Sequence, residues 1–138
     1  MANAIYPLYK QALLQGSTNT TLNAAEGSTG VYAELVDTGV YTYNAAHQFY
    51  DDLSGIIGSA QEITTKTQTN GTFDGNDITF SSVSGNTAEA LVIYRQNAGA
   101  NSTWRLVAYL DTGVGGLPVT PNGTDIIVTW NASGIFTL

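Results

Sequence analysis

The sequence predicts an all-β, mainly antiparallel fold, a β-sandwich or small barrel with a short N-terminal helix and one short helix in a loop near residues 45–53. From about residue 60 onwards, segments rich in β-branched and aromatic residues recur roughly every ten residues, with turn residues between them. Helical patterns occur only before residue 54, so helices do not alternate with the later strands as a parallel α/β fold requires. The length of 138 residues indicates a single domain, 1–138. Within it we expect residues 1–16 to form an N-terminal arm or helix and residues 31–138 to form the β core.

The N-terminal helix is predicted by apolar side chains that share one helical face. Pro7 falls in its first turn and Gly16 follows its last turn, where these residues favour the start and the end of a helix. The apolar face consists of Ile5, Leu8, Tyr9, Ala12 and Leu13. Residues 17–30 form a polar segment, which predicts a loop or a weak edge strand.

Two further elements are predicted before residue 54. Residues 31–36 predict a strand, because two sets of side chains alternate there. One set is Val31, Ala33 and Leu35, and the other is Tyr32 and Glu34. Residues 45–53 predict the second helix, which Asn44 would cap and Gly55 would end. Its shared face would be Ala46, Phe49, Tyr50 and Leu53.

The rest of the chain predicts strands and turns. Asn70-Gly71 is the composition of a tight hairpin turn. The two longest apolar segments, 88–95 and 104–111, are joined by a polar loop, and we expect them to form the central hairpin. The other predicted strands are residues 63–69, 72–73, 78–83, 125–130 and 135–138.

Composition and charge exclude several classes of partner and site. Four Lys and Arg against eleven Asp and Glu give a net charge of −7, which repels nucleic acids and anionic membranes, so we expect neither as a partner. The chain has no cysteine and one histidine, which excludes disulfide scaffolds, thiolate nucleophiles and sites that need two imidazoles. The first residues lack the pattern of a secretion signal, and no apolar run reaches the length of a membrane helix, so we expect synthesis in a cytoplasm.

The sharpest chemical motif is a repeated Asp-Thr-Gly, at residues 37–39 and 111–113. Aspartic proteases use two such loops to share one proton between carboxylates. Here Val follows each copy, and half of this chain is too short for one protease lobe, so we predict turns instead. Residues 74–77 lack the glutamate of a calcium loop, and the sequence nominates no nucleophile for His47. We therefore predict no enzymatic activity and no catalytic, cofactor or metal site.

Several stretches stand out together: residues 12–16, 35–47, 87–94 and 116–123, with the final strand and residues 135–136. They resemble a family of small structural proteins from the virions of tailed bacteriophages. In order, they cover most of the chain. The resemblance implies a head decoration (cement) protein on the capsid exterior that binds the major capsid protein, with a tail or adaptor component as the alternative. It implies no catalytic residues.

A clamp between capsomers needs a rigid core and apolar ends that reach a neighbour. We therefore expect a homotrimer or dimer, bound to the major capsid protein through both ends of the chain. The interface candidates are Tyr6, Tyr9, Leu13, Leu14, Ile135, Phe136 and Leu138. A second hypothesis is a tail-fibre-associated module that binds a host-surface glycan, with Trp104 and Trp130 as stacking platforms.

Overall fold

The centre of the fold is a five-stranded antiparallel sheet. In a computed structural model that describes residues 3–138, its strand order is β1-β8-β7-β2-β3. The strands are β1 (Ala4–Ile5), β8 (Arg105–Leu110), β7 (Ala90–Arg95), β2 (Val31–Val36) and β3 (Ile56–Glu62). The central hairpin, β7 and β8, lies within the two segments that the sequence predicts, and every residue of these two strands is buried apart from Arg105.

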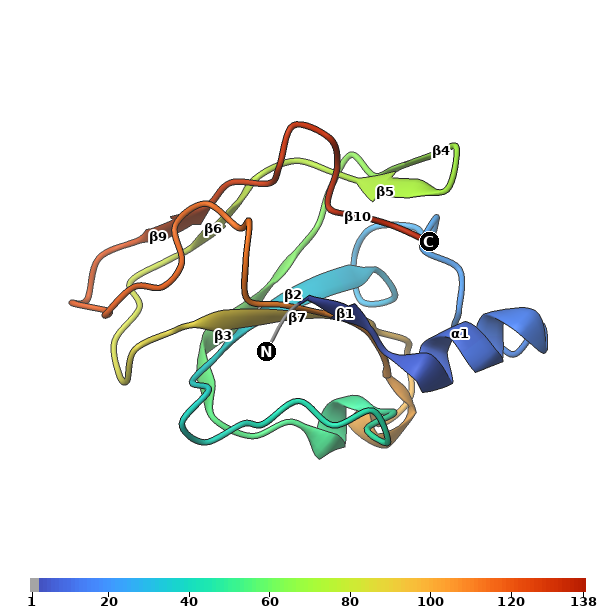
Figure 1. Cartoon of the computed structure of the whole chain (residues 1–138), viewed down its shortest axis with the longest axis horizontal. Coiled ribbons are helices and arrows are strands. Elements are labelled where there is room, and N and C mark those ends of the chain that lie inside the picture. Colours follow the sequence, from blue (N-terminus) through green and yellow to red (C-terminus); the bar gives the residue numbers. More distant parts are fainter. Residues whose placement is uncertain (1–2) are drawn as a thin grey trace.

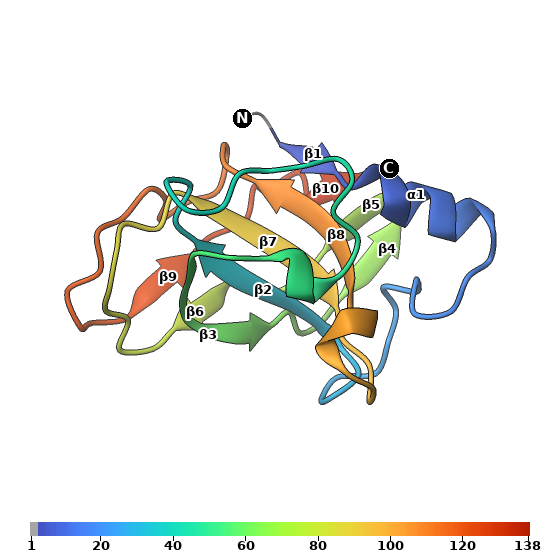
Figure 2. The ribbon, with the colours of Figure 1, turned by 90° about the horizontal axis from the view of Figure 1, so that it is seen from below.

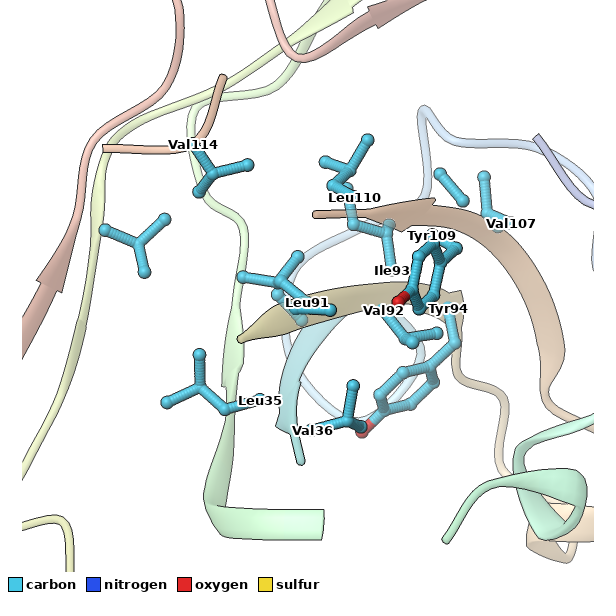
Figure 3. Packing of buried hydrophobic residues seen from close by; sticks show 14 of the residues in the cluster. Leu35, Val36, Leu91, Val92, Ile93, Tyr94, Val107, Tyr109, Leu110 and Val114 are labelled. Carbon is cyan, nitrogen blue, oxygen red and sulfur yellow. The ribbon is translucent and has the colours of Figure 1, made fainter. Parts of the chain in front are cut away.

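Shorter strands cover one face of this sheet (Figure 1). A three-stranded sheet has the order β10-β5-β4, and β6 and β9 form a two-stranded antiparallel sheet. Their bounds are β4 (Thr67–Thr69), β5 (Thr72–Asp74), β6 (Ile78–Phe80), β9 (Ile126–Val128) and β10 (Phe136–Thr137). Figure 3 shows Leu110 on the side of the central sheet that faces these strands, and Val36 and Tyr94 on the opposite side. The predicted sandwich-like, mainly antiparallel fold is therefore confirmed.

The opposite face of the central sheet is covered by residues 37–55, which we call the strap (Figure 2). The strap contains one short 3-10 turn, η1 (Tyr50–Asp52), and a second turn, η2 (Asn101–Thr103), links β7 to β8. Because both faces of the sheet are covered, every residue of β2 except Tyr32 is buried.

The N-terminal helix is confirmed as α1 (Pro7–Leu14), with Gly16 in the left-handed region at φ +63°. Ile5, however, belongs to β1, which pairs with β8 through Ala4↔Tyr109 and Ile5↔Ala108. Of the two forms expected for residues 1–16, an arm or a helix, the described residues form the helix, preceded by a strand that pairs with β8. Residues 1–2 lie outside the described residues.

The helix predicted over residues 45–53 is wrong except for η1. The Asp52 carboxylate accepts the amide protons of Gln48 (2.7 Å) and Phe49 (3.0 Å), which holds the chain extended before the turn. Phe49 then forms a β-bridge with Arg105 of β8. Pairing with β8 therefore replaces the helical hydrogen bonds that the sequence pattern favours.

The remaining segments contain strands and turns, as predicted, but the bounds of the strands differ from the predicted ones. The Asn70-Gly71 turn joins β4 to β5, with both residues at positive φ (53° and 79°), as a two-residue hairpin turn of this composition requires. The strand predicted over 63–69 is confirmed only for β4, and β3 was not predicted. Residues 17–30 contain no strand. The Arg95 side chain fastens this loop by donating to the carbonyl of Thr21 (2.9 Å) and to that of Thr29.

Candidate functional site

The two ends of the chain meet in one exposed apolar surface. The C-terminus lies beside α1 (Figure 2), because β10 pairs with β5 and the Leu138 amide donates to the Gly71 carbonyl at 2.9 Å. A shallow groove of about 340 Å³ lies between them. We call its lining the terminal surface: Ile5, Lys10, Leu13, Leu14, Thr137 and Leu138. Leu14 is 90% exposed and Leu138 is 60% exposed, which makes them the outermost apolar groups of this surface.

The seven predicted interface residues divide into three groups. Leu13, Leu14 and Leu138 lie in the terminal surface. Tyr6 and Tyr9 are only 0% and 2% exposed, so predicting them as contact residues is wrong within this chain, because β1 and α1 place both rings in the core. The other two, Ile135 and Phe136, are half-buried and pack against the core, where the Phe136 ring lies 5.3 Å from that of Phe73.

The two Asp-Thr-Gly segments form turns, as the sequence predicts. The Asp37 carboxylate accepts the Gly39 amide proton at 2.7 Å with one oxygen and an Asn86 side-chain proton at 2.9 Å with the other. In the second segment, the Asn3 side chain accepts the amide protons of Asp111 (2.8 Å) and Thr112 (3.0 Å). The backbone of each turn is thus fixed by hydrogen bonds from the turn itself or from a neighbouring strand.

The side chains of the predicted turn at residues 74–77 also make hydrogen bonds that stabilise the fold. Asp77 accepts the Trp130 amide proton at 2.9 Å, and the Asn76 side chain donates to Thr65 at 3.0 Å. Across residues 3–138, no three His, Cys, Asp or Glu side chains are grouped so as to hold a metal ion.

A hollow of about 460 Å³ opens beside the first half of the strap. Its lining combines tyrosines with two carboxyl groups, and includes Tyr41, Tyr43, Glu89, Tyr109 and Asp111. Burial, with the nearby charges of Asp111 and Glu89, raises the pKa of Tyr109. One Glu89 oxygen accepts both the amide and the hydroxyl proton of Thr38, at 2.8 and 3.0 Å. The carboxyl groups give the hollow a negative potential, which disfavours anions.

A chain of hydrogen bonds joins the strap to the N-terminal segment. The Tyr6 and Tyr41 hydroxyls lie 2.7 Å apart, and the Tyr41 hydroxyl lies 2.9 Å from Nδ1 of His47. Burial raises the pKa of Tyr6 and of Tyr41, so both phenols stay protonated at neutral pH. His47, for which the sequence offered no partner, therefore belongs to the strap's packing.

A buried carboxyl group lies under the second half of the strap. Glu34 is 2% exposed, and its Oε2 accepts the Tyr50 hydroxyl proton at 3.0 Å. Its Oε1 is buried without a hydrogen-bond partner in the described chain. Sequence reasoning missed this group, because alternation along β2 places Glu34 on the polar side of a strand, and no local signal shows that the strap covers that side.

The two tryptophans of the glycan hypothesis differ in their surroundings. Trp130 is 8% exposed and its indole nitrogen donates to the Asn76 carbonyl at 2.8 Å, so its prediction as an exposed stacking platform is wrong. Trp104 is half-buried, and Tyr94 covers one of its faces at 5.8 Å with an interplanar angle of 7°.

The chain matches no known protein-family model, and no curated protein shows significant similarity to it. Among residues 3–138, no helix has both the length and the apolar character needed to cross a membrane.

Proposed function

We propose that this chain is a non-enzymatic structural protein of a bacteriophage virion, and specifically a head decoration protein on the capsid exterior that binds the major capsid protein and stabilises the shell. The observation that supports this proposal most is the terminal surface. It gathers exposed apolar side chains from both ends of the chain and holds them on a β core, which is the arrangement a clamp between neighbouring subunits needs. The resemblance of residues 35–47 and 116–123 to virion proteins points in the same direction.

The energetics favour contact with a second surface. Burying a leucine side chain that is exposed in the monomer stabilises a contact by about 1.5–3 kcal/mol. Leu14 and Leu138 are the two most exposed large apolar groups of the terminal surface. A partner that covers both side chains therefore gains this burial free energy from each of them. Many copies on one shell add such contacts without a need for tight binding by each. The net charge of −7 keeps free copies soluble before they assemble.

The test is the binding of the purified protein to DNA-free, expanded heads of the phage that encodes it, counted per particle by electron microscopy. We expect ordered copies on the heads and at least a ten-fold loss of occupancy in the double variant Leu14→Asp, Leu138→Asp. Ile127→Asp is the matched control, because Ile127 is 61% exposed on β9, outside the terminal surface. Its occupancy should equal that of the parent chain.

Two outcomes would contradict the proposal. Unchanged occupancy in the double variant would exclude the terminal surface as the contact. Copies found on tails rather than heads would favour the tail or tail-fibre alternative. Sedimentation of the same variants measures self-association, and we expect the dimer or trimer to weaken only in the double variant.

A further inference from the structure

We propose that the strap is a pH-sensitive latch: while the Glu34 carboxyl is protonated, Glu34 and Tyr50 fasten the strap to the sheet, and when that carboxyl ionises, the segment around η1 loosens. This inference concerns the folded chain itself and holds whatever particle the chain belongs to.

The latch has one hydrogen bond where an ionised carboxylate needs several. The Tyr50 hydroxyl donates to Oε2 of Glu34 at 3.0 Å, and no donor within the described residues reaches Oε1. A buried neutral carboxyl tolerates such an environment far better than a carboxylate, because the cost of removing a charge from water exceeds that of removing a dipole. Burial accordingly raises the pKa of Glu34 to about 7, against an opposing effect of the Tyr50 hydrogen bond.

Aromatic side chains lie beside Glu34, and within the described residues it forms no ion pair. The Tyr50 ring lies 4.7 Å from that of Tyr94 and 5.3 Å from that of Trp104, and the charge of Glu34 contributes to the raised pKa of Tyr94. Tyr50 and Tyr94 are therefore the titratable groups that face the carboxyl. The other titratable groups on the elements packed around it are Asp37, Tyr41, Tyr43, His47, Asp51 and Asp52 on the strap, Tyr32 on β2, Glu62 on β3, Arg95 on β7, and Arg105 and Tyr109 on β8. The structure shows no hydrogen bond or ion pair from any of these to Glu34.

The segment of the strap around η1 has weaker backbone pairing than strand β2, which carries Glu34. Strand β2 pairs with β7 through all six of its residues, including Glu34↔Val92, and with β3 on its other edge, where the register shifts between Ala33 and Leu35. The β7 ladder therefore holds the backbone of Glu34 in place. The segment at η1 is held to β8 by two backbone hydrogen bonds, from Tyr50 to Trp104 (2.8 Å) and from Leu106 to Gln48 (2.9 Å). Ionisation therefore acts on residues 48–53, while Tyr41 keeps the first half of the strap in the core.

The sign of the effect follows from the raised pKa. Below pH 4.5, the ordinary pKa of a glutamate side chain, the carboxyl is protonated in both the closed and the open strap, and the Glu34–Tyr50 contact stabilises the closed form fully. Between pH 4.5 and about 7 the open form loses its proton while the closed form keeps it, so opening becomes easier. Above that range both forms are ionised and the effect is constant. The opening equilibrium should rise by up to roughly a hundred-fold across this window.

Hydrogen exchange read by mass spectrometry on the full chain tests the latch. We expect the opening constant of residues 48–53, corrected for intrinsic exchange, to rise from pH 5 to pH 8, while that of β7 changes much less. In Glu34→Gln the carboxyl cannot ionise, so the rise should disappear. Asp51→Asn is the matched control, because Asp51 is an exposed carboxyl on the same turn and should leave the rise intact. His47→Gln should also leave the rise with pH intact, which distinguishes an effect of the Glu34 carboxyl from an effect of the His47 imidazole.

Two results would overturn the proposal: exchange at 48–53 that does not respond to pH, or a response that persists in Glu34→Gln. If Glu34→Gln fails to fold, carboxyl NMR of the unaltered chain decides the question. A Glu34 midpoint between pH 6 and 8 that coincides with the exchange midpoint of 48–53 supports the latch, and a midpoint below pH 5.5 refutes it.

Discussion

The two faces of the central sheet are covered in different ways. On one face, side chains such as Leu35 and Leu91 meet Phe73, Phe80 and Val128 of the shorter strands, and all five are at most 2% exposed. On the other face, the strap packs its tyrosines against the sheet and covers the Glu34 carboxyl group of β2. Side-chain hydrogen bonds connect Tyr6 to Tyr41 and Tyr50 to Glu34. The strand-covered face is therefore stabilised mainly by apolar burial, whereas the strap-covered face also depends on single hydroxyls and on one protonation state.

This difference has a consequence for where the fold responds to its surroundings. Apolar packing is insensitive to pH and to single polar contacts, while a buried hydrogen-bonded group loses stability when its partner or its proton is removed. The strand-covered face should therefore set the overall stability, and the strap-covered face should set its variation with conditions. Three predictions test this comparison, in order of decreasing effect.

The largest effect is expected for Leu91→Ala on the strand-covered face. Leu91 is 0% exposed in β7, the middle strand of the sheet, and its replacement leaves a cavity that the paired strands cannot close. We expect a loss of about 2–5 kcal/mol in the free energy of unfolding, measured by urea denaturation. The loss should be the same at pH 5 and pH 8. A loss below about 1 kcal/mol would mean that this face is loosely packed and would remove the basis of the comparison.

An intermediate effect is expected from pH alone. Because the folded chain holds the Glu34 proton up to about pH 7 and the unfolded chain releases it near pH 4.5, the contribution of Glu34 to stability falls as pH rises through this window. The upper limit of the fall is about 3 kcal/mol at 1.36 kcal/mol per pKa unit. Urea denaturation of the parent chain and of Glu34→Gln at pH 5 and pH 8 measures it. Equal pH dependence in both chains would assign the effect to other groups.

The strand-covered face was largely predictable from sequence and the strap was not. Alternation and apolar runs predict β2, β7 and β8 because they are properties of the strand itself, and the Asn70-Gly71 turn is encoded by two residues. In the strap, Phe49 and Tyr50 have helical spacing with Ala46 and Leu53, but their backbone pairs with β8, which lies more than fifty residues further along the chain. No local pattern encodes such a long-range contact.

The candidate contact surface was predictable in part for the same reason. Leu14 and Leu138 are apolar residues at the ends of terminal elements, which already marks them as candidates. The division between exposed Leu14 and buried Tyr9 depends on how α1 sits against β8, and the joining of α1 to the C-terminus depends on the pairing of β10 with β5. Sequence reasoning therefore nominated the ends of the chain, where Leu14 and Leu138 are exposed, and could not separate exposed from buried residues on them.

The smallest effect is expected for Tyr6→Phe on the strap-covered face. The change keeps the ring and removes the hydroxyl that lies 2.7 Å from that of Tyr41, while Tyr41 retains its contact with His47. Net loss of one such hydrogen bond costs about 0.5–1.5 kcal/mol, which thermal or urea unfolding can resolve. Tyr43→Phe is the matched control, because its hydroxyl makes no side-chain hydrogen bond that the structure shows, and we expect a change within about 0.5 kcal/mol. A loss in Tyr6→Phe as large as that in Leu91→Ala would mean that hydroxyl contacts under the strap, rather than apolar packing under the strands, set the stability of this fold.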